Sequence, residues 1–257
     1  MTKYYTGTAG WTIPSKCAAL FSSSGSHLER YGKVLNSVEI NSSFYRDHSK
    51  DTYARWAASV PDDFRFAVKL SRKITHDSGL NVDLNTLNGI VSPILKLDTK
   101  LGVILIQLPP KFEFDAALTS AFFRNMRSLY RGAIAVEPRN RTWSGRHCIE
   151  LFHSFRLARV IADPNPLPDL SLETFAKLSN LTYFRLHGSP EIYKSNYAVT
   201  RLKHFRAMAE KSTGKANDVV WYIFDNTTFG HATQNALTMH KLVDQTTTRR
   251  SRRKSMR

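Results

Sequence analysis

Hydrophobic and polar residues alternate with a period of two along several short segments of the chain. In residues 133–139, Ile134 and Val136 share one face of an extended chain, and the other face starts with alanine and ends with Glu137 and Arg139. A strand of this kind packs one face against helices and turns the other toward an interior that becomes polar at its end. The same design recurs along the sequence.

Eight segments enriched in β-branched and aromatic residues lie between turn signals and predict strands. They are Lys3–Thr8, Ser37–Asn41, Phe64–Leu70, Leu101–Leu108, Ala133–Glu137, Ala158–Asp163, Leu181–His187 and Val219–Asn226. The segments between them carry apolar residues at helical spacing and predict helices. These are Leu28–Leu35, Tyr53–Val60, Leu84–Leu97, Ala116–Tyr130, His147–Phe155, Leu172–Leu178, Leu202–Ala209 and Phe229–Val243.

Strand and helix alternate eight times, which predicts an α/β fold with a single (β/α)8 TIM-type barrel over residues 1–244. Strands joined by helical crossovers pair in parallel, and eight such units are the number that closes a barrel. A doubly wound open sheet shares the alternation and is the alternative. No glycine-rich phosphate fingerprint follows the first strand, which argues against a dinucleotide-binding fold.

The composition is basic throughout. The 257 residues are 42% hydrophobic, enough for the core of one barrel, and the formal net charge is +16. Residues 245–257 hold six of the cations and no acid, so residues 1–244 keep +10. A positive field concentrates phosphates and nucleic acids near the protein. We expect residues 245–257 to form a disordered tail, which fits a nucleic-acid patch, a sorting signal or a solubilising end.

The cysteines and the N-terminal segment favour a cytoplasmic protein. Cys17 and Cys148 are far apart and show no metal-binding spacing, so neither a disulfide framework nor a thiolate zinc site is indicated. The chain enters its first strand without an apolar leader, and no later segment is long and apolar enough to span a bilayer. We expect no membrane association.

Almost every predicted strand ends in a polar or ionisable residue, and barrel enzymes place their chemistry at that end. The candidate catalytic residues are Glu39, Glu137, Asp163 and His187. The candidate substrate-binding residues are Trp11, Asn41, Tyr45, Lys69, His76, Gln107, Arg139, Trp143, Arg185 and Asn226. A single residue of this kind is commonly part of a satisfied ion pair. So many ionisable groups in one cavity, however, cost more desolvation free energy than a role in packing alone would justify.

Short motifs in a consistent order carry a family resemblance. They are Gly7–Trp11, Val38–Tyr45, Phe66–Lys69 with Ile74–His76, Leu105–Pro110, Val136–Arg139 with Trp143, Phe184–Gly188, and Phe224–Asn226 with Asn235–Ala236. With these motifs the chain resembles the YecE-like family, a domain of unknown function. The resemblance implies a TIM-type barrel whose motifs collect at one mouth, similar in outline to apurinic-site endonucleases and sugar isomerases. It implies no established reaction.

Two residues depart from the family pattern. Pro138 stands where an aromatic residue is usual, and Asp225 stands where asparagine is more common. Proline cannot donate a hydrogen bond to a strand neighbour, so we expect the fifth strand to end at Glu137 and Arg139 to be re-aimed.

Four functions stay open from the sequence. The first is binding of a phosphorylated small molecule or nucleic acid, with phosphodiester hydrolase chemistry, through Arg139, Arg185 and Lys69. Tyr193 and Tyr197, with the loop tryptophans, are candidates to stack on bases or sugars. The second is a hydrolase or isomerase of a sugar-like substrate that uses Glu39 and Glu137 as acid and base.

The third is a divalent-metal enzyme, and the fourth is a non-enzymatic nucleic-acid-binding scaffold. Ligands for a metal would come from Glu39, Glu137, Asp163 and His187. Most other histidines fall on predicted helices, so the supply of imidazole at the strand ends is poor. We therefore expect no tightly bound metal and no cofactor.

Overall fold

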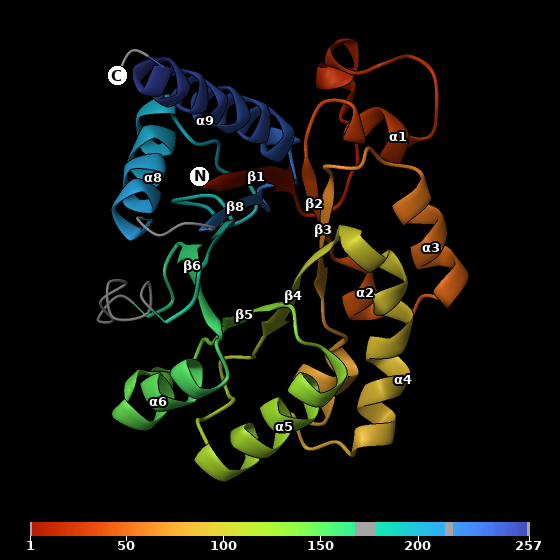
Figure 1. The fold of residues 1–257 in the computed structure, drawn as a ribbon, viewed down its shortest axis with the longest axis vertical. Coiled ribbons are helices and arrows are strands. Elements are labelled where there is room, and N and C mark those ends of the chain that lie inside the picture. Colours follow the sequence, from red (N-terminus) through yellow and green to blue (C-terminus); the bar gives the residue numbers. More distant parts are fainter. Residues whose placement is uncertain (1, 168–177, 214–217, 256–257) are drawn as a thin grey trace.

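Eight parallel strands form a ring in the order β1, β8, β7, β6, β5, β4, β3, β2 (Figure 1). The structure is a computed structural model that describes residues 2–167, 178–213 and 218–255, except the side chains of residues 245–255. The strands are β1 Lys3–Thr8, β2 Ser37–Ile40, β3 Arg65–Lys69, β4 Leu101–Gln107, β5 Ala133–Glu137, β6 Ala158–Asp163, β7 Leu181–Leu186 and β8 Val219–Phe224.

Helices surround this ring on the outside (Figure 1). They are α1 His27–Gly32, α2 Ser42–Tyr45, α3 Lys50–Ala58, α4 Leu84–Ile94, α5 Ala116–Leu129, α6 Arg146–Ser154, α8 Val199–Ser212 and α9 His231–Ser255. Short 3-10 segments occupy Ser15–Leu20, Leu95–Lys100 and Arg141–Ser144, and a π-helical turn occupies Lys73–Asp77. In the described part of the chain, no helix combines the length and apolarity that a membrane crossing needs.

The barrel expected from the sequence is confirmed, and most predicted elements lie within a few residues of their observed bounds. Several strands end one or two residues earlier than expected, because the chain turns into a loop as soon as ladder pairing stops. The predicted helix Leu172–Leu178 falls almost entirely outside the described residues. The backbone of residues 245–255 continues α9, where the composition predicts a tail without fixed structure.

The seam between β1 and β2 is closed largely by side chains. A single bridge pairs Ala9 with Glu39. Asn36, just before β2, then takes the place of a strand neighbour. Its Nδ2 donates to the carbonyl of Tyr4 at 2.8 Å, and its Oδ1 accepts from the amide of Thr6 at 2.8 Å. One side chain thus satisfies both kinds of backbone group and completes the ring.

Two glycines permit close approaches inside the barrel. A Cβ on Gly7 would collide with the carbonyl of Ser37 across the seam, and one on Gly102 would collide with the indole of Trp221. Any larger residue at either position would push a strand or the indole out of place, so these two glycines are needed for packing.

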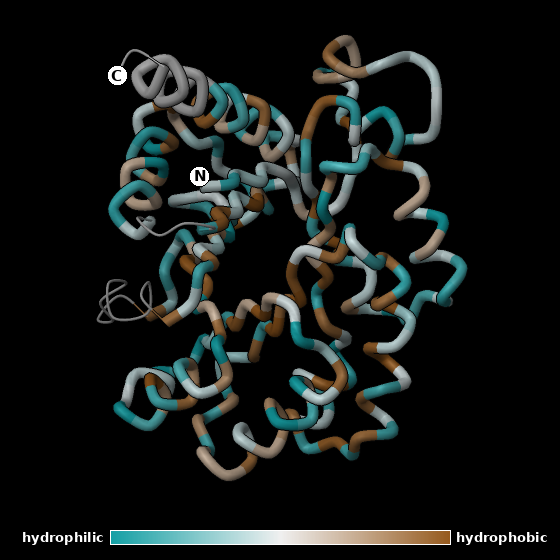
Figure 2. The backbone as a smooth tube through the Cα atoms, in the orientation of Figure 1, coloured by the Kyte–Doolittle hydropathy of each residue, from teal (hydrophilic) through white to brown (hydrophobic). Residues whose placement is uncertain are grey.

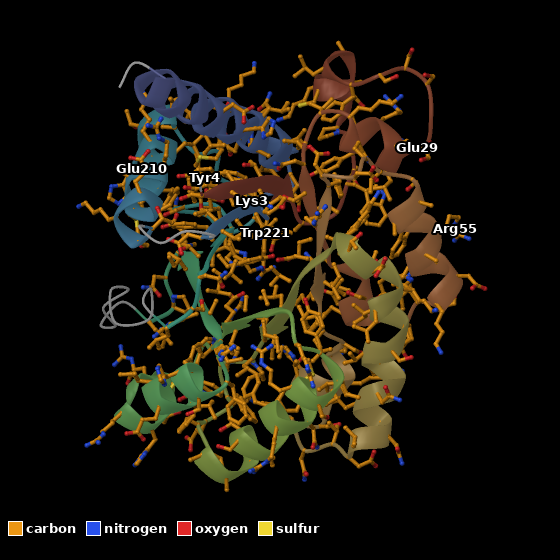
Figure 3. The ribbon with its side chains drawn as sticks, viewed as in Figure 1. Lys3, Tyr4, Glu29, Arg55, Glu210 and Trp221 are labelled. Carbon is orange, nitrogen blue, oxygen red and sulfur yellow. The ribbon has the colours of Figure 1, made fainter. Side chains whose placement is uncertain are left out.

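An apolar plug fills the barrel from its amino-terminal end. Trp221 of β8 is 1% exposed, and its ring lies 4.9 Å from that of Tyr5 and 5.8 Å from that of Tyr183. Figure 3 shows Trp221 toward the middle of the ring, while Glu29 and Arg55 project from the outer helices. Hydrophobic residues recur along the strands of the ring in Figure 2, and brown and teal residues alternate along the outer helices.

Strand parity decides which residues reach the interior. The inward cluster includes Ala135 of β5, Val160 of β6 and Ile223 of β8. Because side chains alternate along a strand, residues two positions further on continue on the same face. The polar ends of these inward rows lie above the plug and form the mouth of the barrel.

Candidate active site at the mouth of the barrel

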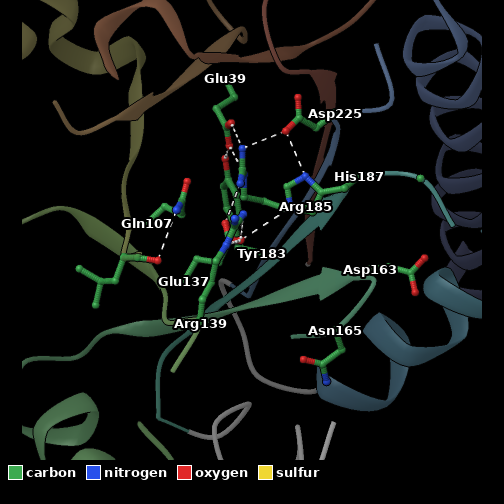
Figure 4. A network of polar contacts seen from close by, with 12 residues as sticks. Glu39, Gln107, Glu137, Arg139, Asp163, Asn165, Tyr183, Arg185, His187 and Asp225 are labelled. Carbon is green, nitrogen blue, oxygen red and sulfur yellow. Dashed lines mark hydrogen bonds and ion pairs between the residues drawn. The ribbon is translucent and has the colours of Figure 1, made fainter. Parts of the chain in front are cut away.

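Arg185 of β7 is the centre of a buried ion-pair network at the mouth (Figure 4). Its Nε and Nη2 donate to the two carboxylate oxygens of Glu39, at 3.0 and 2.8 Å. Its Nη1 donates to Oε2 of Glu137 at 2.6 Å, and its Nη2 lies 3.4 Å from Oδ2 of Asp225. The Arg185 side chain is only 1% exposed, so these carboxylates, and not water, neutralise its charge.

The network keeps its groups charged in spite of burial. Burial alone would raise the pKa of Glu137, but the positive charge of Arg185 holds that pKa well below its ordinary value. Burial would lower the pKa of Arg185, and the surrounding carboxylates raise it instead. Tyr183 donates its hydroxyl to Glu39 at 2.9 Å, and burial together with that carboxylate raises the pKa of the phenol.

His187 follows β7 and is held by one ring nitrogen. Its Nδ1 lies 3.0 Å from Oδ2 of Asp225, so Nδ1 carries the proton that this carboxylate accepts. Its Nε2 lies 3.6 Å from Oε1 of Glu137, an ion-pair distance too long for a hydrogen bond. Nε2 is buried without a hydrogen-bond partner in the described structure. Burial would lower the pKa of His187, but Asp225 and Glu137 raise it.

Arg139 lines a cavity next to His187. Its Nε and Nη2 donate to Oε1 of Glu137 at 3.0 and 2.8 Å, and its side chain is 25% exposed. β5 ends at Glu137, as the proline at 138 led us to expect, and Arg139 folds back onto that carboxylate. The cavity has a volume of about 260 Å³ and is lined by Pro110, Glu137, Arg139, Ala162, Pro164, Asn165, Pro166, His187, Ile192 and Tyr193.

Lys69, at the end of β3, is a buried amine without an ion-pair partner among the described residues. Its Nζ lies 4.0 Å from the centre of the Phe44 ring. Burial and the charge of Arg185 lower the pKa of Lys69 to about 8, although Glu39 and other carboxylates act in the opposite direction. His76 meets the same phenyl ring at 4.9 Å, and burial followed by the charge of Lys69 lowers its pKa.

Gln107 and Asn41 are two more predicted binding residues at strand ends. Gln107 is buried at the end of β4, where its Nε2 donates to the carbonyl of Leu108 at 3.3 Å. Asn41 follows β2 and is half-buried, and its Oδ1 is buried without a partner in the described structure. His76, a third predicted binding residue, has its Nδ1 2.8 Å from the hydroxyl of Thr75.

Asp163 does not join the network, contrary to the sequence expectation. Its Oδ1 accepts from Arg201 of α8 at 2.6 Å, and its Oδ2 accepts from the hydroxyl of Tyr197 at 2.9 Å. Figure 4 shows its carboxylate apart from the arginine cluster. The reason is parity, since Ala162 lines the cavity and the next residue points outward toward the helices.

Asn226 also points away from the interior, although we expected it at the mouth. It is fully buried, and its Nδ2 donates to the carbonyl of Ser195 at 2.8 Å and to Oδ1 of Asn235 at 2.9 Å. Asn226 therefore joins the loop after β8 to the loop after β7. The residue before it, Asp225, takes the inward position.

The loop aromatics mostly pack within the protein. Trp143 is fully buried and donates its indole N–H to the carbonyl of Phe112 at 3.1 Å, so it presents no surface to a ligand. Trp11 is half-buried against Trp56. Tyr45 is 72% exposed, so it is free to meet a ligand at the rim.

Comparison with known proteins places this barrel in a family. A family model described as Protein of unknown function DUF72 matches residues 5–256. The chain belongs to the DUF72 family. It is 23% identical over 270 residues to UPF0759 protein YunF of Bacillus subtilis, covering 93% of this chain and 94% of YunF. UPF0759 protein YecE of Escherichia coli is 30% identical over 108 residues, which span 42% of this chain and 38% of YecE.

Solved structures of DUF72 proteins share the fold. A crystal structure from Enterococcus faecalis superposes with a TM-score of 0.73 at 21% identity, covering 95% of this chain and 96% of that one. A structure from Thermotoga maritima gives a TM-score of 0.72 at 21% identity, covering 94% and 99%. At these identities the likeness shows a common barrel.

Two residues of the DUF72 mouth were missing from the sequence-based selection. Tyr183 lies two positions before Arg185 on the same face of β7, so strict alternation would have included it. Asp225 continues the inward row of β8 through Trp221 and Ile223. A parity count from the apolar inward residues would have selected Asp225 in place of Asn226.

The candidate metal ligands of this DUF72 barrel do not form a metal site in the described part of the chain. Among the described residues, no group of three or more His, Cys, Asp or Glu side chains is arranged to hold a metal ion. Asp163 faces α8, and Glu39 has both oxygens on Arg185. The carboxylates at the mouth are instead neutralised by arginine.

Proposed function

We propose that the mouth of this DUF72 barrel is the active site of an enzyme that acts on a small phosphate-bearing substrate, with His187 as general acid. One observation carries the proposal. Asp225 fixes Nδ1 of His187, while Nε2 is buried without a hydrogen-bond partner in the described chain and the ring lines the cavity. An imidazole that is held at one nitrogen and has no hydrogen bond at the other is suited to proton transfer.

The charges around the cavity favour an anionic substrate. Arg139 is partly exposed in the cavity wall, so its outer guanidinium N–H groups are available to phosphate oxygens. Lys69 lies outside the cavity lining, over the Phe44 ring, and adds a positive charge to the mouth that no carboxylate pairs with in the described chain. Arg185 is buried and bonded to carboxylates, so we assign it to holding the site together and not to the substrate.

The cavity limits the size of the substrate. A volume of about 260 Å³ lies just below the usual range for ligand pockets, so it fits a sugar phosphate, a mononucleotide or the terminal nucleotide of a strand. A double helix would not enter. Pro166, Ile192 and Tyr193 add apolar surface to the cavity lining, which suits a sugar face or a base.

The chemistry that this arrangement supports best is hydrolysis of a phosphate ester. Water attacks phosphorus, the bond from phosphorus to the leaving oxygen breaks, and Nε2 of protonated His187 gives its proton to that oxygen. The proton released by the attacking water restores the imidazolium. Glu137, 3.6 Å from Nε2, stabilises the charged ring before it gives up its proton and again after the proton is restored.

A sugar hydrolase that uses Glu39 and Glu137 as acid and base is less well supported. Glu39 is fully buried, with its oxygens bonded to Arg185 and Tyr183. Glu137 accepts from Arg185 and Arg139, and its low pKa makes it a poor general acid. Neither carboxylate is free to move a proton to or from a sugar.

The test compares phosphorylated ligands with their neutral parents. Mononucleotides, sugar phosphates and the matching nucleosides and sugars are titrated by calorimetry, and hydrolysis of phosphate esters is followed by release of the alcohol. We expect Arg139→Ala to weaken binding of a phosphorylated ligand by about tenfold or more, the usual loss for a charged hydrogen bond. His187→Gln should leave binding in place and lower turnover by about 10² to 10⁴.

Arg124→Ala is the matched control, because Arg124 is an exposed arginine on α5 outside the cavity. It should change neither binding nor turnover. Equal affinity for a phosphorylated compound and its neutral parent would reject the anion site and favour the sugar-like substrate. Binding of strands with no turnover of any ester would favour the non-enzymatic scaffold.

A further inference from the structure

A second and larger hollow lies at the opposite end of the barrel, where β5, β6 and β7 begin. Its volume is about 600 Å³. Three arginines line it, Arg127 from the last turn of α5, Arg131 from the loop before β5 and Arg156 from the loop after α6. The other lining residues are Gly132, Ala133, Ile134, Ser154, Phe155, Ala158, Ser179, Asn180 and Leu181. We call this set the floor hollow.

Among the residues that the structure describes, the lining of the floor hollow is positive and contains no carboxylate. Arg127 is tied to main-chain carbonyls through all three guanidinium nitrogens. Nε and Nη2 donate to the carbonyl of Phe155 at 2.9 and 2.7 Å, and Nη1 donates to that of Gly132 at 2.5 Å, so Arg127 contributes its charge and no free N–H. None of the three arginines forms an ion pair with an acid in the part of the chain that the structure describes. Their charges are therefore not compensated there, in contrast to Arg185 at the mouth.

Arg156 has a backbone conformation that its side chain does not favour. Its φ is 49°, the left-handed region, and it stands just after α6, where glycine is the usual choice. Arginine at this position is not explained by the turn. Its side chain places an exposed cation at the edge of the hollow, and a strained residue of this kind is a reason to look for function.

The positive surface extends beyond this hollow. An adjoining hollow of about 220 Å³ shares Ala133, Asn180 and Leu181 with it and adds Lys3 and Arg65. Trp221 lines this adjoining hollow and belongs to the apolar plug. The plug separates the floor from the mouth.

We propose that the floor hollow is a second binding site and that its ligand carries several phosphate groups. Arginine forks match phosphate oxygens. The exposed guanidinium groups of Arg131 and Arg156, with no acid beside them in the described lining, suit a chain of phosphates better than a single anion, and Arg127 adds its charge. The volume of the floor hollow lies within the range of small-molecule pockets, so we expect a ligand of about the size of one nucleotide. Free nucleoside triphosphate and the phosphorylated end of a nucleic-acid strand share this chemistry.

The experiment measures binding of inorganic triphosphate, ATP, adenosine and a ten-nucleotide 5′-phosphorylated RNA strand to the full-length protein by calorimetry. Arg131→Glu and Arg156→Glu reverse charges at exposed positions, so the fold should tolerate both. We expect each to raise the Kd for triphosphate and ATP about tenfold or more. Arg124→Glu makes the same charge change on α5 outside the lining and should alter the Kd by less than about twofold.

Arg156→Gly provides a second, independent measurement. Because glycine adopts the left-handed conformation without strain, this variant should melt at a higher temperature than the parent while it binds triphosphate more weakly. Adenosine should not bind. A strand that binds much more tightly than ATP, with the same sensitivity to Arg156→Glu, identifies a strand end as the ligand, and similar affinities identify the free nucleotide.

An equal loss of triphosphate binding in Arg124→Glu would overturn the proposal, since the effect would then come from the overall field. Absence of measurable triphosphate binding would overturn it as well. If Arg139→Ala abolishes triphosphate binding and the floor variants leave it unchanged, the floor site is rejected and the proposed function of the mouth stands.

Discussion

Arg185 of β7 and Glu39 of β2 are joined by two hydrogen bonds of 3.0 and 2.8 Å, with side chains that are 1% and 0% exposed. These strands are not neighbours in the ring, so the pair crosses the barrel interior. Buried pairs of this kind gain little net stability over apolar packing, but breaking one leaves an uncompensated charge. The pair therefore fixes the mouth geometrically.

Glu39→Gln should lower the free energy of unfolding by about 3 to 5 kcal/mol, the usual cost of leaving a buried partner unpaired. Urea denaturation of the parent and the variant measures the difference. Glu150→Gln is the control, because Glu150 pairs with Arg146 on the exposed surface of α6. It should cost no more than about 0.5 kcal/mol. Similar small losses in both variants would contradict a fixed cross-barrel pair.

Lys69→Met should stabilise the protein at neutral pH. A tenfold change in an ionisation constant is worth about 1.4 kcal/mol, so a fall in the pKa of Lys69 from 10.5 to about 8 costs the folded state on the order of 3 kcal/mol. Methionine fills a similar volume without a charge. The same variant should bind phosphorylated ligands more weakly, which is the usual trade-off between stability and function.

The sign of the pH dependence follows from this lowered pKa of Lys69. Between about pH 8 and 10.5 the unfolded chain binds a proton at Lys69 that the folded chain lacks, so the parent gains stability as the pH rises. The advantage of Lys69→Met is thus full below pH 8 and disappears by about pH 10.5. Urea titrations at pH 7, 9 and 10.5 measure it, and an advantage that stays constant would show that Lys69 is not destabilised by burial.

The barrel was predictable from the sequence because its signals are repetitive. Eight alternations of strand and helix define the fold even when single boundaries are displaced. The early ends of β2 and β7 therefore leave the predicted fold unchanged. The closing seam was not predictable, since Asn36 bridges β1 and β2 through a side chain that carries no periodic signal.

The site was predictable only as far as strand parity was respected. Glu39, Glu137, Arg185 and His187 follow inward rows and meet as expected. Asp163 misses the mouth by one residue, because Ala162 holds the inward position and Asp163 lies on the outward face of β6. Which cations stay free could not be read from the sequence, because that depends on which side chain reaches which carboxylate.

Asp225→Asn should lower the pKa of His187. In the parent, hydrogen bonding to Asp225 and the nearby Glu137 raise that pKa above its ordinary value in spite of burial. An amide in place of the carboxylate removes the negative charge next to Nδ1. The protonated ring loses more stabilisation than the neutral ring, so the pKa falls. NMR titration of the His187 ring measures the change. Asp47→Asn, which removes a carboxylate paired with Lys73 instead, should leave the His187 titration unchanged.

The raised pKa of His187 also predicts how stability depends on pH. A histidine with a raised folded pKa contributes its full stability below its unfolded pKa of about 6.5, and the contribution is lost as the pH rises through the folded pKa. His187→Gln should therefore be more destabilising at pH 5.5 than at pH 9. Equal destabilisation at both values would mean that the ring acts only through packing.

Removing residues 245–257 should reduce affinity for single-stranded nucleic acid and flatten its salt dependence, without changing the affinity of the mouth for a small phosphorylated ligand. The segment holds six cations and no acid. Each phosphate contact adds about 0.7 to the slope of log K against log salt for a single strand, so the slope should fall by up to about 4. Fluorescence anisotropy of a labelled strand at several salt concentrations measures this.

A full-length variant with all six of these cations changed to glutamine separates charge from chain length. Because the backbone of α9 runs through Ser255, truncation also removes helix, and glutamine keeps a helix-forming side chain in place. We expect the glutamine variant to match the truncated protein in slope and in strand affinity, since counterion release depends on charge alone. If truncation abolishes binding of small phosphorylated ligands as well, the mouth is not an independent anion site and its assignment to Arg139 and Lys69 fails.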